Sequence, residues 1–363
     1  MTPAAIKRFA VIVPAYNASK TIVDCLEAIL SSTRKPSEVI VYHDGLTDNI
    51  NTIALVPNVR VITNPGAPAG PARGRNAGSR ESTCDVLIFV DADVIVAKDA
   101  FGLLLDEMDN DAQIWAAFGS YDHAPRVTRL AALYANLRHH WVHQSGQREA
   151  VTFWAGLGAV RREAFWAVGG FDEERGISKI EDIELGTKLK RGRGRIRLVP
   201  EALGTHCKDW TIAQLWRTDI FYRAIPWARL LASGACVGGH LNGATRERWS
   251  AVFAYLSLLT LAGCFLSVWA GVGFIFFAIL YLILNRELFQ LLLRRGGVRA
   301  LVVGVMLHWA YHLYASAAYM IVKLRLLPPA KTGAGFDGGN APPMVPIAVD
   351  LARSGGICDN QRR

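Results

Sequence analysis

The sequence predicts an α/β fold with a largely parallel sheet for the N-terminal part of this 363-residue chain. Strand-like apolar segments alternate with amphipathic helix-like segments up to about residue 115, the order typical of a parallel sheet with crossover helices. Polar residues follow the ends of three of these strands, where such sheets bind ligands. Two long uncharged stretches further along predict a membrane region after the sheet.

Hydrophobic patterning places the elements of the sheet region in order. Strands are expected at residues 9–13, 38–42, 59–62, 86–90 and 197–200, and helices at residues 18–31 and 74–82. Two further helix-like runs, near residues 120–150 and 210–231, interleave arginine and tryptophan with aliphatic residues. That mixture suits a helix lying in a membrane interface and, equally, a helix packed on the domain.

A hydrophobic C-terminal region accounts for much of the apolar content of 51%. Residues 249–285 and 300–322 carry no charged side chain, and a spanning helix needs about 20 apolar residues. We therefore expect two or three transmembrane helices within residues 249–328, preceded by a linker at 236–248; buried helices of a soluble protein are the alternative. The Gly-, Pro- and Ala-rich residues 329–363 are expected to form a flexible tail.

The distribution of charge predicts how the chain sits at a membrane. No signal peptide precedes the first strand, so we expect a multi-pass protein of the inner (cytoplasmic) membrane with its sheet region in the cytosol. The net charge of +9 is explained more simply by anionic lipid headgroups than by nucleic acid. A hairpin over 249–285 agrees with the positive-inside tendency, whereas a third span would put Lys323 and Arg325 outside, against it.

Two aspartates follow the strand at residues 86–90. Alternate side chains of an extended backbone point the same way, so Asp91 and Asp93 can share one divalent cation. Carboxylate oxygens suit Mg²⁺ or Mn²⁺, which commonly bridge to phosphates. An Asp-x-Asp pair by itself is more often only a solvated strand end. The six cysteines have no paired spacing, which argues against a zinc site and indicates a reducing compartment.

Polar residues also follow the first two strands. Tyr16 and Asn17 come after the first strand, and Asp44 comes after the second, so three strand ends are expected to meet at one edge of the sheet. The first turn has no G-x-G-x-x-G motif, which removes the main support for a dinucleotide-binding fold. The Gly- and Pro-rich residues 64–78 predict a surface loop whose basic end can face phosphates or a sugar; a mobile linker is the alternative.

An acidic pair, Glu181 and Asp182, opens a short predicted helix. A carboxylate in the first turn of a helix often serves only as a partner of the helix dipole. In order and spacing, however, these motifs together resemble family 2 glycosyltransferases of the GT-A fold over roughly residues 8–230. The resemblance implies a catalytic domain at residues 1–235, with a Rossmann-like mixed sheet.

The resemblance also implies a role for each matching residue. Asp182, next to Glu181, matches the general base, and Asp91 and Asp93 match the pair that binds metal and diphosphate, with His206 near that metal. It assigns substrate binding to Pro14, Tyr16, Asn17, Asp44, Arg75, Asn76, Asp91, Trp154, Gly156 and Arg217. The implied cofactor is Mg²⁺ or Mn²⁺.

The implied activity is metal-dependent, inverting sugar transfer from a nucleotide-sugar donor to a hydroxyl of a lipid, lipid-linked or glycan acceptor at the cytosolic membrane face. Two departures qualify it. His43 and Leu46 flank Asp44-Gly45 where the family usually has Asp-Asp-Gly-Ser, which leaves the base and ribose contacts open. Thr218 follows Arg217 where processive synthases have tryptophan, which favours single-sugar transfer. A non-catalytic nucleotide-sugar-binding protein and a nucleotidyltransferase are the alternatives.

Overall fold

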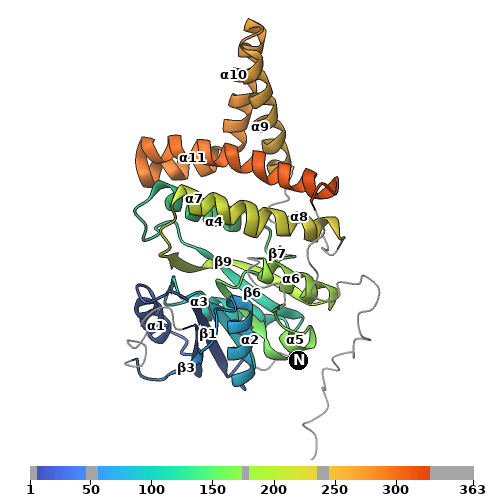
Figure 1. Ribbon diagram of the computed structural model, residues 1–363. Helices are drawn as coiled ribbons and strands as arrows, with labels where there is room; N and C mark the ends of the chain where they lie inside the picture. The colour runs from blue at the N-terminus through green and yellow to red at the C-terminus, as the bar shows by residue number, and fades with distance from the viewer. Residues whose placement is uncertain (1–5, 46–55, 174–179, 235–244, 328–363) are drawn as a thin grey trace, which may run out of the picture. The chain divides into compact units, whose positions relative to one another are not determined.

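The computed structural model describes residues 6–45, 56–173, 180–234 and 245–327. Within these residues, nine strands form one sheet: β1 (Phe9–Ala15), β2 (Glu38–Asp44), β3 (Val59–Asn64), β4 (Val86–Val90), β5 (Val94–Val96), β6 (Ile114–Tyr121), β7 (Glu149–Ala150), β8 (Leu157–Arg161) and β9 (Arg195–His206). Their order is β3-β2-β1-β4-β8-β6-β9-β5, and β7 pairs with β9 (Figure 1).

The sheet is mixed. β3, β2, β1 and β4 are parallel, as predicted, whereas β8 runs antiparallel to both β4 and β6. β9 is parallel to β6 and antiparallel to β5 and β7. The predicted α/β fold is confirmed. The parallel arrangement is interrupted by β8, β5 and β7, whereas β6 and β9 run in the same direction as β1–β4. Short apolar runs carry little information about strand direction.

The helices connect these strands and continue beyond them. They are α1 (Ile22–Ser31), α2 (Pro71–Glu81), α3 (Ala100–Asn110), α4 (Leu130–Gln144), α5 (Arg162–Ala167), α6 (Glu181–Arg191), α7 (Ile212–Arg217), the π-helical turn η2 (Thr218–Ala224), α8 (Ile225–Ala232), α9 (Thr245–Gly263), α10 (Val268–Leu284) and α11 (Arg286–Lys323).

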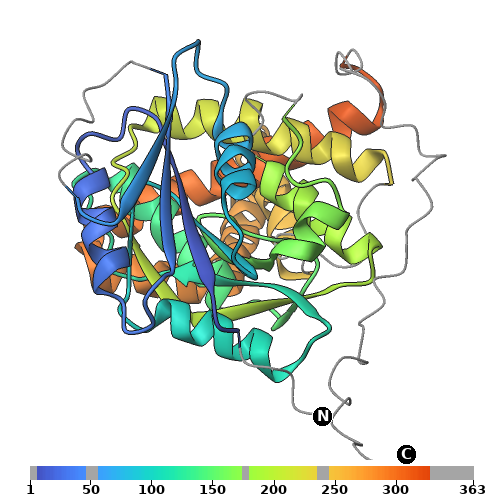
Figure 2. The ribbon, with the colours of Figure 1, turned by 90° about the horizontal axis from the view of Figure 1, so that it is seen from below.

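Helices cover both faces of the sheet, as β1 shows. Val11 and Val13 pack in the apolar cluster that includes α1 and α3, whereas Ala10 and Ile12 pack in the cluster that includes α2, α5 and α6 (Figure 2). This alternation is expected of side chains along a strand. Gly78 of α2 lies directly on β1, since a Cβ there would be 2.6 Å from the Ile12 side chain. The glycine thus lets α2 approach the sheet.

α2 begins at Pro71, three residues earlier than predicted. Proline is favoured in the first turn of a helix because its φ suits the helix and its missing N–H has no partner there. Arg75 and Asn76, which lie both in the predicted helix at 74–82 and at the end of the Gly- and Pro-rich segment 64–78, are on this helix. A helix holds their side chains in fixed directions, as a loop would not.

The segment predicted as a third span, residues 300–322, belongs to the longer helix α11, which has a break at Gly297 (φ +68°). Leu307 of α11 packs in one apolar cluster with Leu137 of α4. Among the described residues, no helix taken singly has both the length and the apolar character to cross a membrane. Only α10 and α11 taken together meet that requirement, with a bend of 75° between them.

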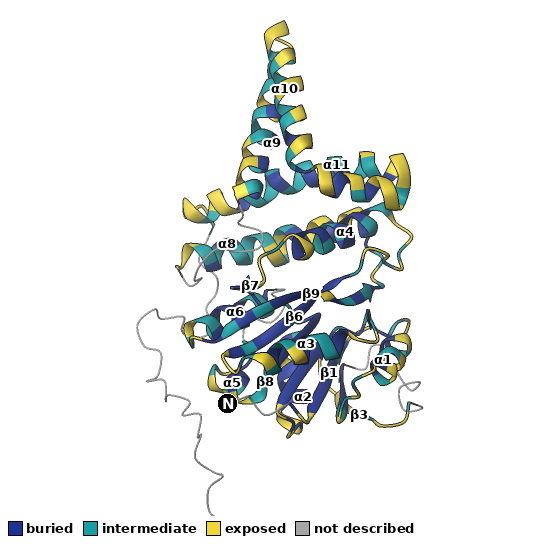
Figure 3. Cartoon of the chain, turned by 180° about the vertical axis from the view of Figure 1, so that it is seen from behind, coloured by how far each residue is buried: buried dark blue, intermediate teal, exposed yellow. Residues whose placement is uncertain are grey.

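α9 and α10 pack against each other and expose apolar side chains, most of all at the turn that joins them (Figure 3). Phe265 and Leu266 there are 94% and 90% exposed, and Trp269 is 78% exposed. α9 begins at Thr245, inside the predicted linker at 236–248. The rest of that linker and the tail at 329–363 lie outside the described residues.

Candidate functional site

The strand ends meet as the sequence predicts. β1 pairs in parallel with β2 on one side and β4 on the other, so Asn17, Asp44 and Asp91 follow adjacent strands at the same edge of the sheet. Asn17 has a φ of +51°, a left-handed conformation that asparagine tolerates better than most residues. Tyr16 beside it is 52% exposed, whereas Pro14 belongs to β1 itself. The opening turn therefore offers one exposed aromatic ring at this edge.

Asp44 organises the loop that leads into α2. Its buried carboxylate accepts hydrogen bonds from the backbone N–H groups of Ala69 (3.0 Å) and Gly70 (2.7 Å) and from the side-chain amide of Asn64 (2.9 Å). These donors converge on one carboxylate, so the loop is closed over the end of β2. The side chain predicted to contact a base thus also sets the shape of the loop beside it.

Arg75 joins two of the predicted motifs. Its guanidinium donates to Oδ1 of Asp91 at 2.6 Å and to Oε1 of Glu181 at 2.8 Å, and only 4% of the side chain is exposed. Burial lowers the pKa of Arg75, but the two carboxylates outweigh burial and raise the pKa above its usual value. Among the described residues, Nε of Arg75 and Oε2 of Glu181 are buried without a hydrogen-bond partner.

Asn76 holds the segment before α6. Its amide donates to the backbone O of Phe171 (2.9 Å) and to Glu173 (2.8 Å), and its oxygen accepts from the Phe171 N–H (3.0 Å). With 2% of its surface exposed, Asn76 is fully engaged by the protein. The structure therefore places it beside the site as a clamp on the chain that leads toward Asp182.

Asp182 is a carboxyl group with a strongly perturbed pKa. Burial, and then the neighbouring charge of Glu181, raise its pKa from 3.8 to about 7, against opposing contributions from Arg75 and two backbone N–H groups. Those N–H groups belong to Ile183 (2.8 Å) and Ala155 (3.4 Å). A carboxyl group that changes protonation near neutral pH is suited to general-base chemistry.

Asp93 faces His206. Oδ1 of Asp93 lies 3.6 Å from Nε2 of His206, and β5, which follows Asp93, is antiparallel to the end of β9 that carries the histidine. Burial raises the pKa of Asp93, but His206 and Lys208 outweigh burial and lower the pKa to about 2. Nδ1 of His206 contacts Oδ1 of Asn136 at 2.6 Å, and its ring stacks on Tyr121 at 4.4 Å.

Trp154 closes this part of the site with other aromatic rings. Its ring lies 4.8 Å from Tyr121 and 4.7 Å from His139. Gly156 is needed beneath it, because a Cβ at that position would lie 2.4–2.8 Å from the Trp154 indole. The Gly156 carbonyl accepts the backbone N–H of Asp91, which ties this loop to the Asp-x-Asp pair.

Arg217 is exposed at the end of α7, and within the described part of the chain it makes no hydrogen bond or ion pair to the residues above. Gln214 of the same helix and Thr211 before it form a capping box, in which the side chain of each accepts from the backbone N–H of the other. The helix-like run at 120–150 instead supplies residues that sequence reasoning did not assign to the site. These are Asn136 and His139 on α4, and Tyr121 at the end of β6. The arginine and tryptophan spacing of this run suits a membrane interface and ordinary packing equally well, and no pattern in it marks Asn136 or Tyr121.

The donor atoms present fit a divalent cation that is partly held by substrate. Asp93 and His206 present a carboxylate oxygen and an imidazole nitrogen to the same space, with Asp91 two residues away. Oxygen with one nitrogen suits Mn²⁺ or Mg²⁺. Among the described residues, no group of three or more His, Cys, Asp or Glu side chains is arranged to hold an ion. The other ligands would have to come from diphosphate oxygens and water.

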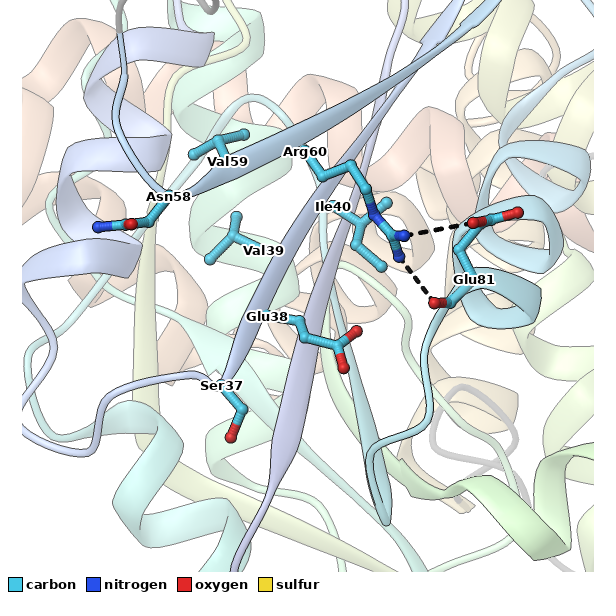
Figure 4. Close-up of a pocket in the computed structure, with 8 residues that line it drawn as sticks. All are labelled: Ser37, Glu38, Val39, Ile40, Asn58, Val59, Arg60 and Glu81. Atoms are coloured by element: carbon cyan, nitrogen blue, oxygen red, sulfur yellow. Dashed lines mark hydrogen bonds and ion pairs between the residues drawn. The ribbon is translucent and has the colours of Figure 1, made fainter.

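A cavity of about 510 Å³ lies elsewhere on the sheet, at the amino-terminal ends of β2 and β3 (Figure 4). Arg60 donates across it to Oε2 (3.3 Å) and to the backbone O (2.7 Å) of Glu81. None of its lining residues is a predicted site residue, because the predicted residues follow the opposite ends of the strands. The lining is Ser37, Glu38, Val39, Ile40, Asn58, Val59, Arg60 and Glu81.

Comparison with known proteins bears on this arrangement. Residues 10–169 match the sequence model of the family described as Glycosyl transferase family 2. The poly-beta-1,6-N-acetyl-D-glucosamine synthase of Staphylococcus aureus (strain COL) is 25% identical over 239 residues, 62% of this chain and 53% of that protein. An uncharacterized glycosyltransferase of Rickettsia felis is 27% identical over 111 residues, 30% of this chain and 18% of that protein. The chain thus spans about half the length, or less, of these relatives.

Among solved structures, the mannosyltransferase PcManGT from Pyrobaculum calidifontis, in complex with GDP-Man and Mn²⁺, is similar with a TM-score of 0.50. The sequences are 18% identical, and the match covers 88% of this chain and 90% of that chain. At 18% sequence identity, this similarity is one of fold alone. It supports the mixed α/β architecture described above.

Proposed function

Because residues 10–169 belong to glycosyl transferase family 2, we propose that this protein transfers a sugar from a nucleotide-sugar donor to an acceptor hydroxyl with inversion of the anomeric centre. The bridge that Arg75 makes between Asp91 and Glu181 carries the proposal. It holds the Asp-x-Asp pair, which would face the leaving diphosphate, beside the acidic pair that would take the proton.

Asp182 is the general base of the proposed reaction. The acceptor oxygen forms a bond to the anomeric carbon while the bond from that carbon to the diphosphate oxygen breaks. The hydroxyl proton passes to Asp182, and the nucleoside diphosphate leaves with the bonding electrons. Attack from the face opposite the leaving group inverts the anomeric centre. Asp182 has a pKa of about 7, so its carboxyl group can accept a proton at neutral pH.

Asp93 and His206, with Asp91 two residues away, would hold Mg²⁺ or Mn²⁺ together with substrate oxygens, and the cation when bound supplies positive charge to the leaving diphosphate. Arg75 adds a buried positive charge beside Asp91. On the donor side, Tyr16 offers an exposed ring to the base and Asp44 shapes the adjoining loop. Both substrates would then be held in line for transfer.

The donor and mode of transfer follow from sequence likeness. Similarity to the S. aureus synthase makes a nucleotide of N-acetylglucosamine the first donor to test. The Thr218 departure from the processive motif favours transfer of a single sugar. The role of Asp182 is tested by measuring the nucleoside diphosphate that is released from UDP-N-acetylglucosamine or GDP-mannose. The assay contains Mn²⁺ and membrane-lipid acceptors. Asp182→Asn should lower turnover at least 100-fold, as expected for loss of a general base.

The same assay separates the alternatives. Release of inorganic diphosphate identifies a nucleotidyltransferase, and donor binding without turnover on any acceptor extract identifies a binding protein. Exposed Asp85→Asn is the matched control, because it removes one carboxylate away from the site and should leave turnover unchanged. Full turnover in both Asp182→Asn and Asp91→Ala would refute the assigned roles.

We also propose that the protein acts at a membrane, through the α9–α10 hairpin. Phe265 and Leu266 at the turn and Trp269 at the start of α10 are exposed and suit a lipid environment. Arginines near the hairpin suit anionic headgroups; they stand at positions 246, 248, 286, 294 and 295. A Phe265→Asp/Leu266→Asp variant should float less with anionic vesicles than the wild type. Val61→Asp, at another exposed apolar position, is the control that should float normally. Equal flotation of all three proteins would contradict membrane binding by the hairpin.

A further inference from the structure

We propose that Asn136 is a positioning residue that decides which nitrogen of His206 faces Asp93. The inference rests on the proposed function, in which Asp93 and His206 hold a divalent cation. Asn136 lies on α4, far from the sequence motifs of the site, and only 1% of its surface is exposed. No motif in the sequence marked this residue.

The orientation of the Asn136 side chain is fixed by its own helix. Nδ2 donates to the backbone O of Ala132 at 2.8 Å, and Oδ1 lies 2.6 Å from Nδ1 of His206. A carbonyl oxygen can only accept a hydrogen bond, so the NH₂ end of the amide must face Ala132. The oxygen of Asn136 is therefore the atom that faces the histidine.

This orientation determines the state of the imidazole. Since Oδ1 of Asn136 is an acceptor, Nδ1 of His206 must carry a hydrogen and donate it. In the neutral ring Nε2 is then the nitrogen that presents a lone pair, and it lies 3.6 Å from Oδ1 of Asp93. A carboxylate oxygen and an imidazole lone pair repel one another unless a positive charge lies between them. Without metal a proton on Nε2 can supply that charge, and a divalent cation can take its place.

A further contact restrains the ring. Tyr121 stacks on His206 with a centroid distance of 4.4 Å and an angle of 19° between the planes. Stacking restrains the plane of the ring but does not distinguish its two nitrogens, whereas the amide of Asn136 does. Partners of this kind, behind a metal-binding histidine, typically change metal affinity by about 10–100-fold when they are removed.

A purely structural role for Asn136 makes a different prediction. The opposite face of α4 carries Tyr134, whose hydroxyl lies 3.0 Å from Nδ1 of His308 on α11. Tyr134→Phe also removes a buried hydrogen bond from α4, but not one to the site. If Asn136 only stabilises the fold, Tyr134→Phe and Asn136→Leu should change the protein in the same way. If Asn136 positions His206, only Asn136→Leu should change the state of the His206 ring.

The first test uses the full chain without metal. In ¹⁵N-labelled protein, imidazole nitrogen shifts report which nitrogen of His206 carries the hydrogen, with His206→Ala providing the assignment. We expect hydrogen on Nδ1 in the wild type, in Tyr134→Phe and in Asn136→Asp, which keeps an acceptor. Asn136→Leu should lose this preference. The inference would be overturned if the hydrogen exchanged between Nδ1 and Nε2 of His206 in the wild type, or if it stayed on Nδ1 in Asn136→Leu.

The second test measures Mn²⁺ affinity in the presence of UDP by electron paramagnetic resonance. Asn136→Leu should weaken binding about 10-fold, while Asn136→Asp should stay within about 3-fold of the wild type. In a His206→Ala background, Asn136→Leu should cause no further loss, because its effect passes through that histidine. Additive losses overturn the positioning role.

The two tests also separate this inference from the function on which it rests. If nucleoside diphosphate is released and His206→Ala weakens Mn²⁺ binding, but Asn136→Leu does not, only the role of Asn136 is wrong. If the wild type neither binds Mn²⁺ nor releases nucleoside diphosphate, the proposed function fails together with the inference.

Discussion

Arg75 on α2 donates a hydrogen bond of 2.8 Å to Glu181 at the start of α6, across 106 positions of the chain. Both side chains are buried, and the second arm of the guanidinium holds Asp91. A buried arginine between two carboxylates fixes the distance between the Asp-x-Asp pair and the acidic pair. Removing one member of such a group leaves a buried charge without a partner and typically costs about 3–5 kcal/mol.

Glu181→Gln should move the pH dependence of the reaction to lower pH. The charge of Glu181 helps to raise the pKa of Asp182 to about 7, and the amide oxygen of glutamine can still accept from Arg75. The acidic limb of the kcat/KM profile should therefore move down by about one pH unit. Glu163→Gln, which removes an exposed charge on α5, should leave the profile in place. An upward shift in Glu181→Gln would contradict this electrostatic coupling.

Asp182→Asn should be more stable than the wild type at pH 8 although it is inactive. The pKa of Asp182 in the folded protein, about 7, lies above the ordinary 3.8, so folding favours the protonated form. That contribution to stability is complete below pH 3.8 and is lost as the pH rises through 7. Asparagine is neutral at every pH, so the melting temperature should rise by about 2–4 °C at pH 8, as for about 1 kcal/mol.

Thermal unfolding at pH 8 and pH 4 measures this difference. At pH 4, where the wild-type carboxyl group is already protonated, the two proteins should melt together. Asp85→Asn serves as the control on an exposed carboxylate and should show no such pH-dependent gain. A destabilised Asp182→Asn at pH 8 would show that contacts of the ionised carboxylate outweigh the cost of burying its charge.

Asp44→Asn should weaken donor binding more than it slows the chemical step. The Asp44 carboxylate accepts from the N–H groups of Ala69 and Gly70, and an amide in its place can turn an NH₂ group toward these donors. Loss of one such contact costs about 1–3 kcal/mol, so KM for the donor should rise about 10-fold. Asn64→Ala removes only one donor to Asp44 and should have a smaller effect. Steady-state kinetics with varied donor distinguish the two.

Gly156→Ala should lower turnover with little change in stability of the sheet. The new Cβ would lie 2.4–2.8 Å from the Trp154 indole, so the ring must move away from its place beside Tyr121 and His139. Displacing a ring that lines the site should reduce kcat/KM about 10-fold, which corresponds to about 1.4 kcal/mol. Gly102→Ala is the matched control, because nothing lies within 4 Å of its Cβ and alanine favours a helix. Equal kinetics for both variants would argue against a role for Trp154.

Much of the site could be predicted because its motifs lie at strand ends. Asp91 follows a strand of five buried apolar residues, and Asp44 ends another, so periodicity alone placed them at one edge of the sheet. Asn136 could not be found in this way, because a single asparagine within a helix has no pattern of its own. Its role depends on which face of α4 meets His206, and that is decided by packing.

The C-terminal region shows the same limit. The stretch at residues 300–322 carries no charged side chain and is expected to form a span, yet in the structure it forms part of α11 and buries His308 and His312. Composition cannot distinguish a helix packed on protein from one packed on lipid, since both bury apolar side chains. Partners from distant parts of the chain decide between them.

By itself the sequence determined the α/β class, the convergence of Asn17, Asp44 and Asp91 at one edge, and the acidic pair that opens α6. These follow from local patterns of apolar and polar residues along single elements. Only the tertiary structure decided that Arg75 joins Asp91 to Glu181, that β8 runs antiparallel between β4 and β6, and that Asn136 faces His206. Each of these depends on contacts between elements far apart in the chain, which local periodicity does not encode.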